Sequence, residues 1–117
     1  MSITHSELVK ALVKPAINIV HNFTEKDAGL IHMAVGIAGE SGELLDAIKK
    51  VVIYKKPIDI NHVIEELGDL EFYMEGLRQE LGLNRDDILK ANIEKLSVRY
   101  NGLKYSDDAA KNRADKV

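Results

Sequence analysis

The sequence contains no cysteine. The chain can therefore form neither a disulfide framework nor a zinc–thiolate site, and cysteine usage leaves its redox compartment open. A surplus of positive charge is missing too, because the formal net charge is −3. Binding to a nucleic-acid polymer or to an anionic membrane requires a basic surface, so we expect neither partner. If the protein handles phosphates, it must do so locally, through bound cations.

Long apolar stretches are also absent. No uncharged apolar run approaches the roughly 20 residues that span a bilayer. The segment from Met1 to Ala11 carries Thr4, His5 and Glu7 where a signal peptide needs an apolar region, so we expect a cytoplasmic protein. With 45% apolar and 30% charged residues, the composition is that of a soluble globular protein, and the length suits one domain over residues 1–117.

Apolar residues recur at helical spacing along most of the chain. In the longest expected helix, the apolar positions Met33, Ile37, Leu44, Ile48 and Val52 follow the period of a one-sided helix. Capping residues and glycines mark the ends of the helices. A first helix begins at Thr4 and either ends near Val13 or restarts with Pro15 in its first turn and runs to about Asn22. The other expected helices run from Asp27 to about Tyr54, from Asp59 or Asn61 to Gly82, from Asn84 to Gly102, and for a few residues after Ser106.

The sequence predicts an all-α fold, namely an antiparallel helical bundle of four or five helices. The connection around Pro57 is short, so the two longest helices should be antiparallel neighbours. Several short helices carry apolar stripes, and a chain of 117 residues cannot readily cover all of them. We therefore expect self-association to complete the bundle.

Two acid-x-x-acid pairs lie on the two longest expected helices. Glu40 and Glu43 form the first pair, and Glu66 and Asp69 form the second. Residues three apart share a helix face, so each pair can hold two carboxylates side by side. Glu40 falls on the apolar stripe of its helix, and Glu66 and Asp69 fall among apolar residues of theirs. These acids should therefore point toward the packed side.

Carboxylates that converge at such a seam repel one another unless a cation lies between them. Because the chain offers oxygen ligands without cysteine or suitably spaced histidine, the fitting ion is Mg²⁺, for which Mn²⁺ can substitute. Mg²⁺ usually shares its coordination with substrate phosphates, so a triphosphate substrate follows. Either acidic pair alone could equally be a solvated helix face. Only the presence of both on apolar stripes of consecutive helices supports a metal site.

Glycines are unusually frequent around these motifs. Gly36, Gly39 and Gly42 lie inside the longest expected helix, where each costs about 1 kcal/mol relative to alanine. Their presence predicts that another backbone or a ligand comes close to this helix. Gly42 and Gly68, which lie within the two acidic motifs, would leave room for an ion.

At these motifs the chain resembles the MazG-like, all-α NTP pyrophosphohydrolases. The run from His32 to Lys50 looks like the first signature helix of that family, and the run from Glu65 to Leu70 looks like the second. The family motif is E-x-x-E, a variable spacer, and E-x-x-D. The segment from Asn92 to Tyr100 is similar to the family's Asn-x-x-Lys-Leu-x-x-Arg-Tyr segment. The resemblance covers roughly Ile31 to Arg113.

The resemblance implies an enzyme that hydrolyses a (deoxy)nucleoside triphosphate to its monophosphate and pyrophosphate with Mg²⁺. The implied site residues are Glu40, Glu43, Glu66 and Asp69 as magnesium ligands and Asn92, Lys95 and Arg99 as substrate contacts. The last three also share one helix face, and their donor groups suit phosphate oxygens, although surface lysines and arginines are often only solvated. Either Glu40 or Glu43 is the candidate general base for water attack on the α-phosphorus, a displacement that paired metals accelerate.

Several alternatives remain at this point. A di-iron or di-manganese bundle would use Glu-x-x-His pairs, but Glu43 and Asp69 stand where such histidines belong. A non-catalytic interaction module with an acidic seam would release no pyrophosphate. A narrow enzyme for dUTP, dCTP or a guanine nucleotide is an alternative within the family, and the sequence does not identify the base.

The family's assemblies imply a homo-oligomer, either a dimer or a tetramer built as a dimer of dimers, and we favour the tetramer. Arg113 and Lys116 could reach phosphates of a neighbouring protomer, although a loose basic tail is the simpler interpretation.

Overall fold

The computed structural model describes residues 2–113 and 115, and every regular element within them is a helix. In chain order the elements are α1 (His5–Leu12), α2 (Ala16–His21), α3 (Glu25–Val52), α4 (Ile60–Leu81), α5 (Arg85–Arg99), the 3₁₀ helix η1 (Asn101–Leu103) and α6 (Asp107–Asn112). The predicted all-α fold is confirmed. Lys116, considered above as part of a basic tail, lies outside the described residues.

Side-chain caps explain the ends of the two long helices. The side chain of Thr24 accepts a hydrogen bond from the backbone N–H of Asp27, and the Asp27 carboxylate accepts one from the backbone N–H of Thr24. This reciprocal capping box starts α3 slightly earlier than the apolar pattern indicated. Asp59 caps α4 through a backbone N–H of its first turn. Gly82 ends α4 with a φ of 65°, a left-handed conformation that glycine adopts easily.

The N-terminal arm consists of the two short helices α1 and α2. The Thr4 hydroxyl accepts a hydrogen bond from the backbone N–H of Glu7 at 3.1 Å and donates one to the Glu7 carboxylate at 2.9 Å. The expected capping box is therefore formed only in part. The Glu7 carboxylate accepts a hydrogen bond from the hydroxyl of Thr4, whereas in a complete capping box it would accept one from the backbone N–H of Thr4. α1 ends at Leu12, and Pro15 precedes α2 as its N-cap. Of the two expectations, the structure therefore shows the restart, with Pro15 just before the new helix and not in its first turn.

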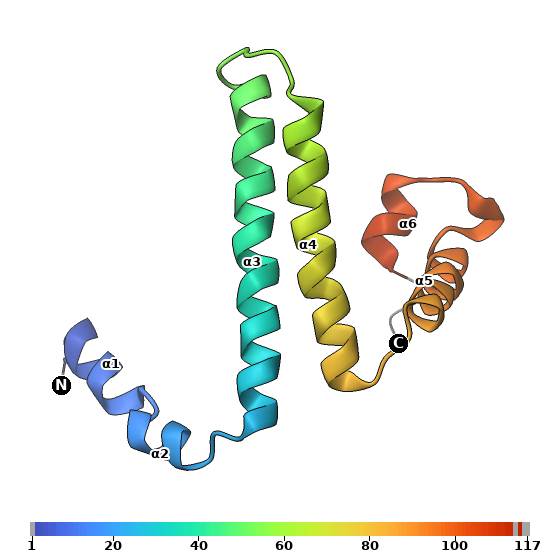
Figure 1. Cartoon of the computed structure of the whole chain (residues 1–117). Helices are drawn as coiled ribbons and strands as arrows, with labels where there is room; N and C mark the ends of the chain where they lie inside the picture. Colours follow the sequence, from blue (N-terminus) through green and yellow to red (C-terminus); the bar gives the residue numbers. More distant parts are fainter. Residues whose placement is uncertain (1, 114, 116–117) are drawn as a thin grey trace.

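α3 and α4 pack against each other as an antiparallel pair (Figure 1). Two glycines allow the backbones to approach closely. A Cβ atom on Gly36 would collide with the ring of Tyr73, and a Cβ atom on Gly76 would collide with the sulfur of Met33. The two contacts are reciprocal. On α3 the large side chain of Met33 lies three residues before Gly36, and on α4 that of Tyr73 lies three residues before Gly76. They fix the separation of α3 and α4 in the lower half of the pair.

Of the glycines Gly36, Gly39 and Gly42, from which a close approach to α3 was expected, only one has a close neighbour in the chain. The close approach predicted at Gly36 is provided by Tyr73. At Gly39 and Gly42, by contrast, a Cβ atom would find no heavy atom of the described chain within 4 Å. No other helix of the chain therefore comes close at these two positions, and the approach of a ligand there stays a prediction. The same open space surrounds Gly68.

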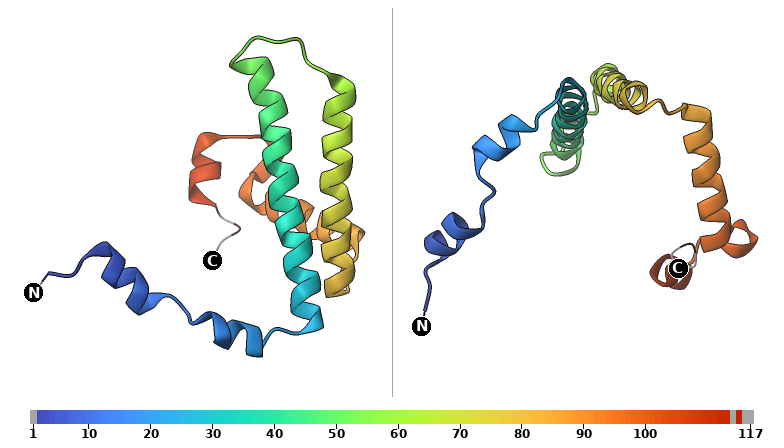
Figure 2. Two further views of the ribbon diagram at one scale, coloured as in Figure 1. Left: turned by 60° about the vertical axis from the view of Figure 1, so that its left-hand side comes forward. Right: turned by 90° about the horizontal axis from the view of Figure 1, so that it is seen from below.

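The single chain is open. The α1–α2 arm and the arm of α5, η1 and α6 both leave the central pair at the end opposite the α3–α4 connection, and both stand away from it (Figure 2). The Cα radius of gyration is 20.3 Å, whereas a compact domain of this length has about 13 Å. The surface area is 9756 Å², against roughly 6,300 Å² for a globular protein of this mass. Completion of the bundle by self-association stays a prediction that this openness favours.

Gly36→Ala should lower the free energy of unfolding, because the added methyl group meets the ring of Tyr73. Such overpacking costs about 1–3 kcal/mol, which exceeds the gain of about 1 kcal/mol that alanine has over glycine in a helix. Gly39→Ala is the matched control in open space and should be neutral or stabilising. Urea unfolding of both variants at one protein concentration measures the difference. Equal stability of the two variants would show that Tyr73 does not press on Gly36.

Candidate metal centre

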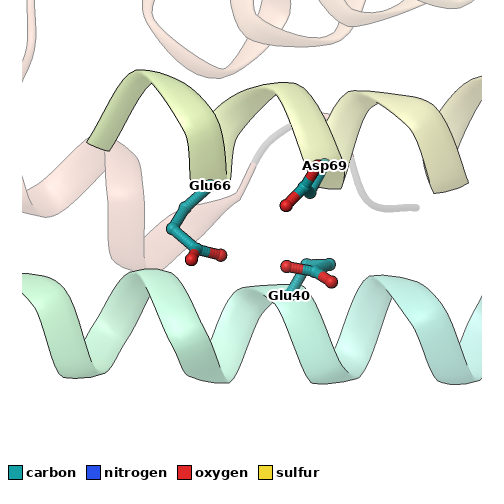
Figure 3. A group of neighbouring side chains, drawn as sticks. All are labelled: Glu40, Glu66 and Asp69. Carbon is teal, nitrogen blue, oxygen red and sulfur yellow. The ribbon is translucent and has the colours of Figure 1, made fainter. Parts of the chain in front are cut away.

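Three carboxylates converge midway along the seam between α3 and α4. Glu40 projects from α3, and Glu66 and Asp69 project toward it from α4 (Figure 3). One oxygen of each carboxylate lies within 4.8 Å of the others. The spacing of Glu66 and Asp69 places them on one face of α4, and the antiparallel packing brings Glu40 opposite them. The structure thus brings three of the four predicted metal ligands together.

The most buried of these acids has an oxygen without a partner. Glu66 is 8% exposed, while Glu40 is half-buried and Asp69 is exposed. Oε1 of Glu66 lies 3.8 Å from Nε2 of His62, but its Oε2 is buried without any hydrogen-bond partner. A buried carboxylate oxygen in this state is costly. It therefore calls for a positive ligand that the described side chains do not supply.

Negative charge accumulates at the same point. Partial burial, a hydrogen bond with Glu66 and the negative charges of Asp69, Glu66 and Glu43 together raise the pKa of the Glu40 carboxyl. A carboxyl whose pKa is raised by folding destabilises the folded state as the pH rises through that pKa. At neutral pH the bare cluster therefore opposes folding, and a bound cation would reverse this effect.

The donor set fits a hard divalent cation. All three groups offer carboxylate oxygens, the ligands that Mg²⁺ and Mn²⁺ prefer. A cation held by Glu40, Glu66 and Asp69 would satisfy the buried oxygen of Glu66 and neutralise part of the shared charge. Asp69 is exposed, so the cluster is open to solvent on this side. Water molecules and a substrate oxygen could complete the coordination there, as is usual for Mg²⁺.

Glu43, the fourth predicted ligand, is not among the carboxylates that meet within this distance. It lies one turn beyond Glu40 on α3 and is exposed. Its negative charge nevertheless contributes to the raised pKa of Glu40, so it remains a neighbour of the cluster. Asp46, one turn further, forms an ion pair with Lys50 at 3.1 Å.

The predicted substrate-binding residues lie on α5, in the arm that stands away from the seam (Figure 2). Lys95 and Arg99 are half-buried, and Asn92 is exposed. Asn92 borders a hollow of about 330 Å³ together with Tyr100. Arg99 is engaged by the carboxylate of Asp115. Within one chain, the structure therefore does not bring these three residues to the carboxylates.

Comparison with known proteins identifies the family of this chain. The family model of the MazG nucleotide pyrophosphohydrolase domain matches residues 29–103. The chain belongs to the MazG nucleotide pyrophosphohydrolase family. The matched region of this MazG domain contains nearly all of α3, all of α4 and α5, and every predicted site residue. Membership of this family supports nucleotide pyrophosphohydrolase chemistry in general.

A weaker similarity connects the MazG domain with a phage protein. "Gene 37 protein" of Mycobacterium phage L5 is 28% identical over 75 residues. The match covers 61% of this chain and 66% of the phage protein, so it spans slightly less than two thirds of that relative. No solved structure matches the chain significantly. Among the residues that the structure describes, no helix is both long and apolar enough to cross a membrane.

Two polar neighbours of the predicted site were not singled out from the sequence. His62 precedes the candidate ligand Glu66 by one helical turn, and this i, i+4 spacing could have indicated the contact. Asp115 reaches Arg99 over a separation of 16 residues. Because the two residues lie in different elements, no periodicity in the sequence links them.

Glu66→Gln should uncouple the stability of the MazG domain from divalent cations. In EDTA the variant should be at least as stable as the wild type, because one negative charge has left the cluster. Mg²⁺ at about 100 times its Kd should stabilise the wild type by about 2.7 kcal/mol and the variant far less. Glu65→Gln makes the same charge change at an exposed neighbouring position and should retain the wild-type response. If thermal unfolding shows equal stabilisation of Glu66→Gln and wild type by Mg²⁺, Glu66 is not a ligand.

Proposed function

We propose that this MazG domain hydrolyses a nucleoside or deoxynucleoside triphosphate to its monophosphate and pyrophosphate in a reaction that requires Mg²⁺. The observation that carries the proposal is the convergence of Glu40, Glu66 and Asp69 within the domain. The unpartnered buried oxygen of Glu66 supports a cation at this point. A polyphosphate suits such a centre because Mg²⁺ commonly shares its coordination with phosphate oxygens.

The metal centre spans two helices. Glu40 on α3 and Glu66 and Asp69 on α4 would hold the cation. When bound, the cation would polarise the phosphoryl oxygens and offset the charge that develops on them. Because the ligands come from both helices, their separation depends on how closely α3 approaches α4. The contact of Tyr73 with Gly36, one turn from Glu40, sets that approach.

Glu43 is the better placed of the two candidate bases. Glu40 belongs to the group of three converging carboxylates, whereas Glu43 lies one turn away and is exposed. An exposed carboxylate beside the cluster can accept the proton of a water molecule that attacks the α-phosphorus. The new bond forms between the water oxygen and the α-phosphorus, the bond to the bridging oxygen breaks, and pyrophosphate leaves with its electron pair.

A homo-oligomer, a tetramer or a dimer, would complete this site. Both arms expose large apolar side chains, among them Leu12 at 74% and Ile93 at 66%. A neighbouring copy could cover these surfaces and bring the donors of α5 to the carboxylates of another chain. Asn92, Lys95 and Arg99 would then stabilise the charge of the phosphates.

Incubation with each common NTP and dNTP, in Mg²⁺ and in EDTA, tests the proposed reaction when the products are resolved by ion-exchange chromatography. We expect monophosphate and pyrophosphate only when metal is present. The ranking of the nucleotides would distinguish a broad enzyme from one that is specific for a base. If Mg²⁺ stabilises the protein but no nucleotide is cleaved, the acidic seam serves a binding module and not an enzyme.

Glu43→Gln should separate the base from the ligands. Because the variant keeps the three converging carboxylates, its Kd for Mg²⁺, measured by calorimetry, should change only slightly. Its kcat should fall by about 100-fold or more, the usual loss when a general base is removed. Glu66→Gln is the comparison variant and should lose Mg²⁺ binding itself. A loss of Mg²⁺ binding in Glu43→Gln equal to that in Glu66→Gln would make Glu43 a ligand.

A further inference from the structure

Arg99 is held by an acid from the segment that follows α6. Its Nε donates a hydrogen bond to Oδ1 of Asp115 at 2.7 Å, and its Nη2 donates one to Oδ2 at 3.2 Å. The two side chains are only 16% and 3% exposed. The other ion pairs in the described part of the chain each join residues within one helix. The Arg99–Asp115 pair is therefore the ion pair that ties a separate segment to α5.

The carboxylate of Asp115 also interacts with a second cationic side chain. Hydrogen bonds from Arg99 and the positive charges of Arg99 and Lys95 lower the pKa of the Asp115 carboxyl. Lys95 and Arg99 are four residues apart on α5, so their side chains project from the same face of the helix. The carboxylate of Asp115 is hydrogen-bonded to Arg99 on this face, and the positive charge of Lys95 also acts on it.

We propose that Asp115 is an internal competitor of the substrate, because its carboxylate occupies the anion site of Lys95 and Arg99 and must leave before a phosphate group can bind there. The proposal rests on the proposed function for the chemical class of the ligand, a polyphosphate. Phosphate and carboxylate engage a guanidinium in the same two-pronged geometry. One edge of Arg99 cannot hold both at once.

The burial of Arg99 favours competition over simultaneous binding. Asp115 takes the edge of the guanidinium that carries Nε and Nη2. Most of the rest of the side chain is covered as well, because only 16% of it is exposed. A phosphate therefore finds little free guanidinium surface while Asp115 is in place. When a binding-competent arrangement is only partly populated, the apparent affinity falls by that fraction.

Calorimetric binding of inorganic pyrophosphate in the presence of Mg²⁺ tests the proposal on the full chain. If Asp115 blocks the site in about nine of ten molecules, Asp115→Asn should lower the Kd for pyrophosphate about tenfold. Asp115→Ala should do the same. Glu94→Gln removes an equal charge from an exposed position beside Lys95 and should change the Kd far less. With a nucleotide substrate, the Asp115 variants should show a lower KM and an unchanged kcat.

An NMR measurement on the wild type does not depend on the folding of any variant. The side-chain carboxyl ¹³C signal of Asp115 should shift to that of a solvated carboxylate when pyrophosphate is added with Mg²⁺. A signal that stays unchanged at saturating pyrophosphate would overturn the proposal. So would folded Asp115 variants that bind pyrophosphate no more tightly than the wild type, because Asp115 would then only position Arg99.

Pyrophosphate binding requires no hydrolysis, so this proposal and the proposed function can fail separately. Tighter binding by the Asp115 variants without cleavage of any nucleotide would support the competitor and reject the reaction. Cleavage of nucleotides by all variants with the same KM would support the reaction and reject the competitor.

Discussion

The structure depends on like charges placed where a helix pair normally buries apolar side chains. Packed helices meet along positions that repeat every three and four residues. In α3 and α4 these positions include Gly36 and Tyr73. The next turn of each helix toward the α3–α4 connection carries Glu40 on α3 and Asp69 on α4. If the helices moved apart to relieve the repulsion, they would lose the close packing of Tyr73 on Gly36 and of Met33 on Gly76. A cation bound as proposed would relieve it, and metal binding and the docking of α3 on α4 would then stabilise each other.

This arrangement explains why so little of the single chain is buried. Ala47 is the one buried apolar side chain among the described residues, and the other buried side chains, Glu66 and Arg78, are charged. Carboxylates occupy part of the face along which α3 and α4 pack. The two arms stand away from the central pair and do not cover its other faces (Figure 1). Because apolar burial drives folding, this low burial favours the predicted self-association, which would cover apolar side chains that one chain leaves exposed.

The sequence predicted what depends on neighbouring residues and missed what depends on distant ones. Helix ends such as those at Asp59 and Gly82 follow from caps that act within one turn. The meeting of Glu66 with Glu40 was also predictable, since helical period and a short connection determine which faces meet. The position of Glu43 outside the group was not predictable, because Glu40 and Glu43 are three residues apart and share a helix face. The partner of Arg99 could not be found, since Asp115 lies 16 residues away in the segment that follows α6.

The Arg99–Asp115 pair has a consequence for how the site distinguishes anions. In the absence of substrate, the carboxylate of Asp115 neutralises cations that would otherwise attract any small anion to α5. A ligand must therefore bind more favourably than a carboxylate that is already in place, and a carboxylate carries a single negative charge. A triphosphate carries several charges and can also engage the metal centre, whereas a singly charged anion has no such advantage. Occupation by an internal acid thus converts a general attraction for negative charge into a preference for polyphosphates.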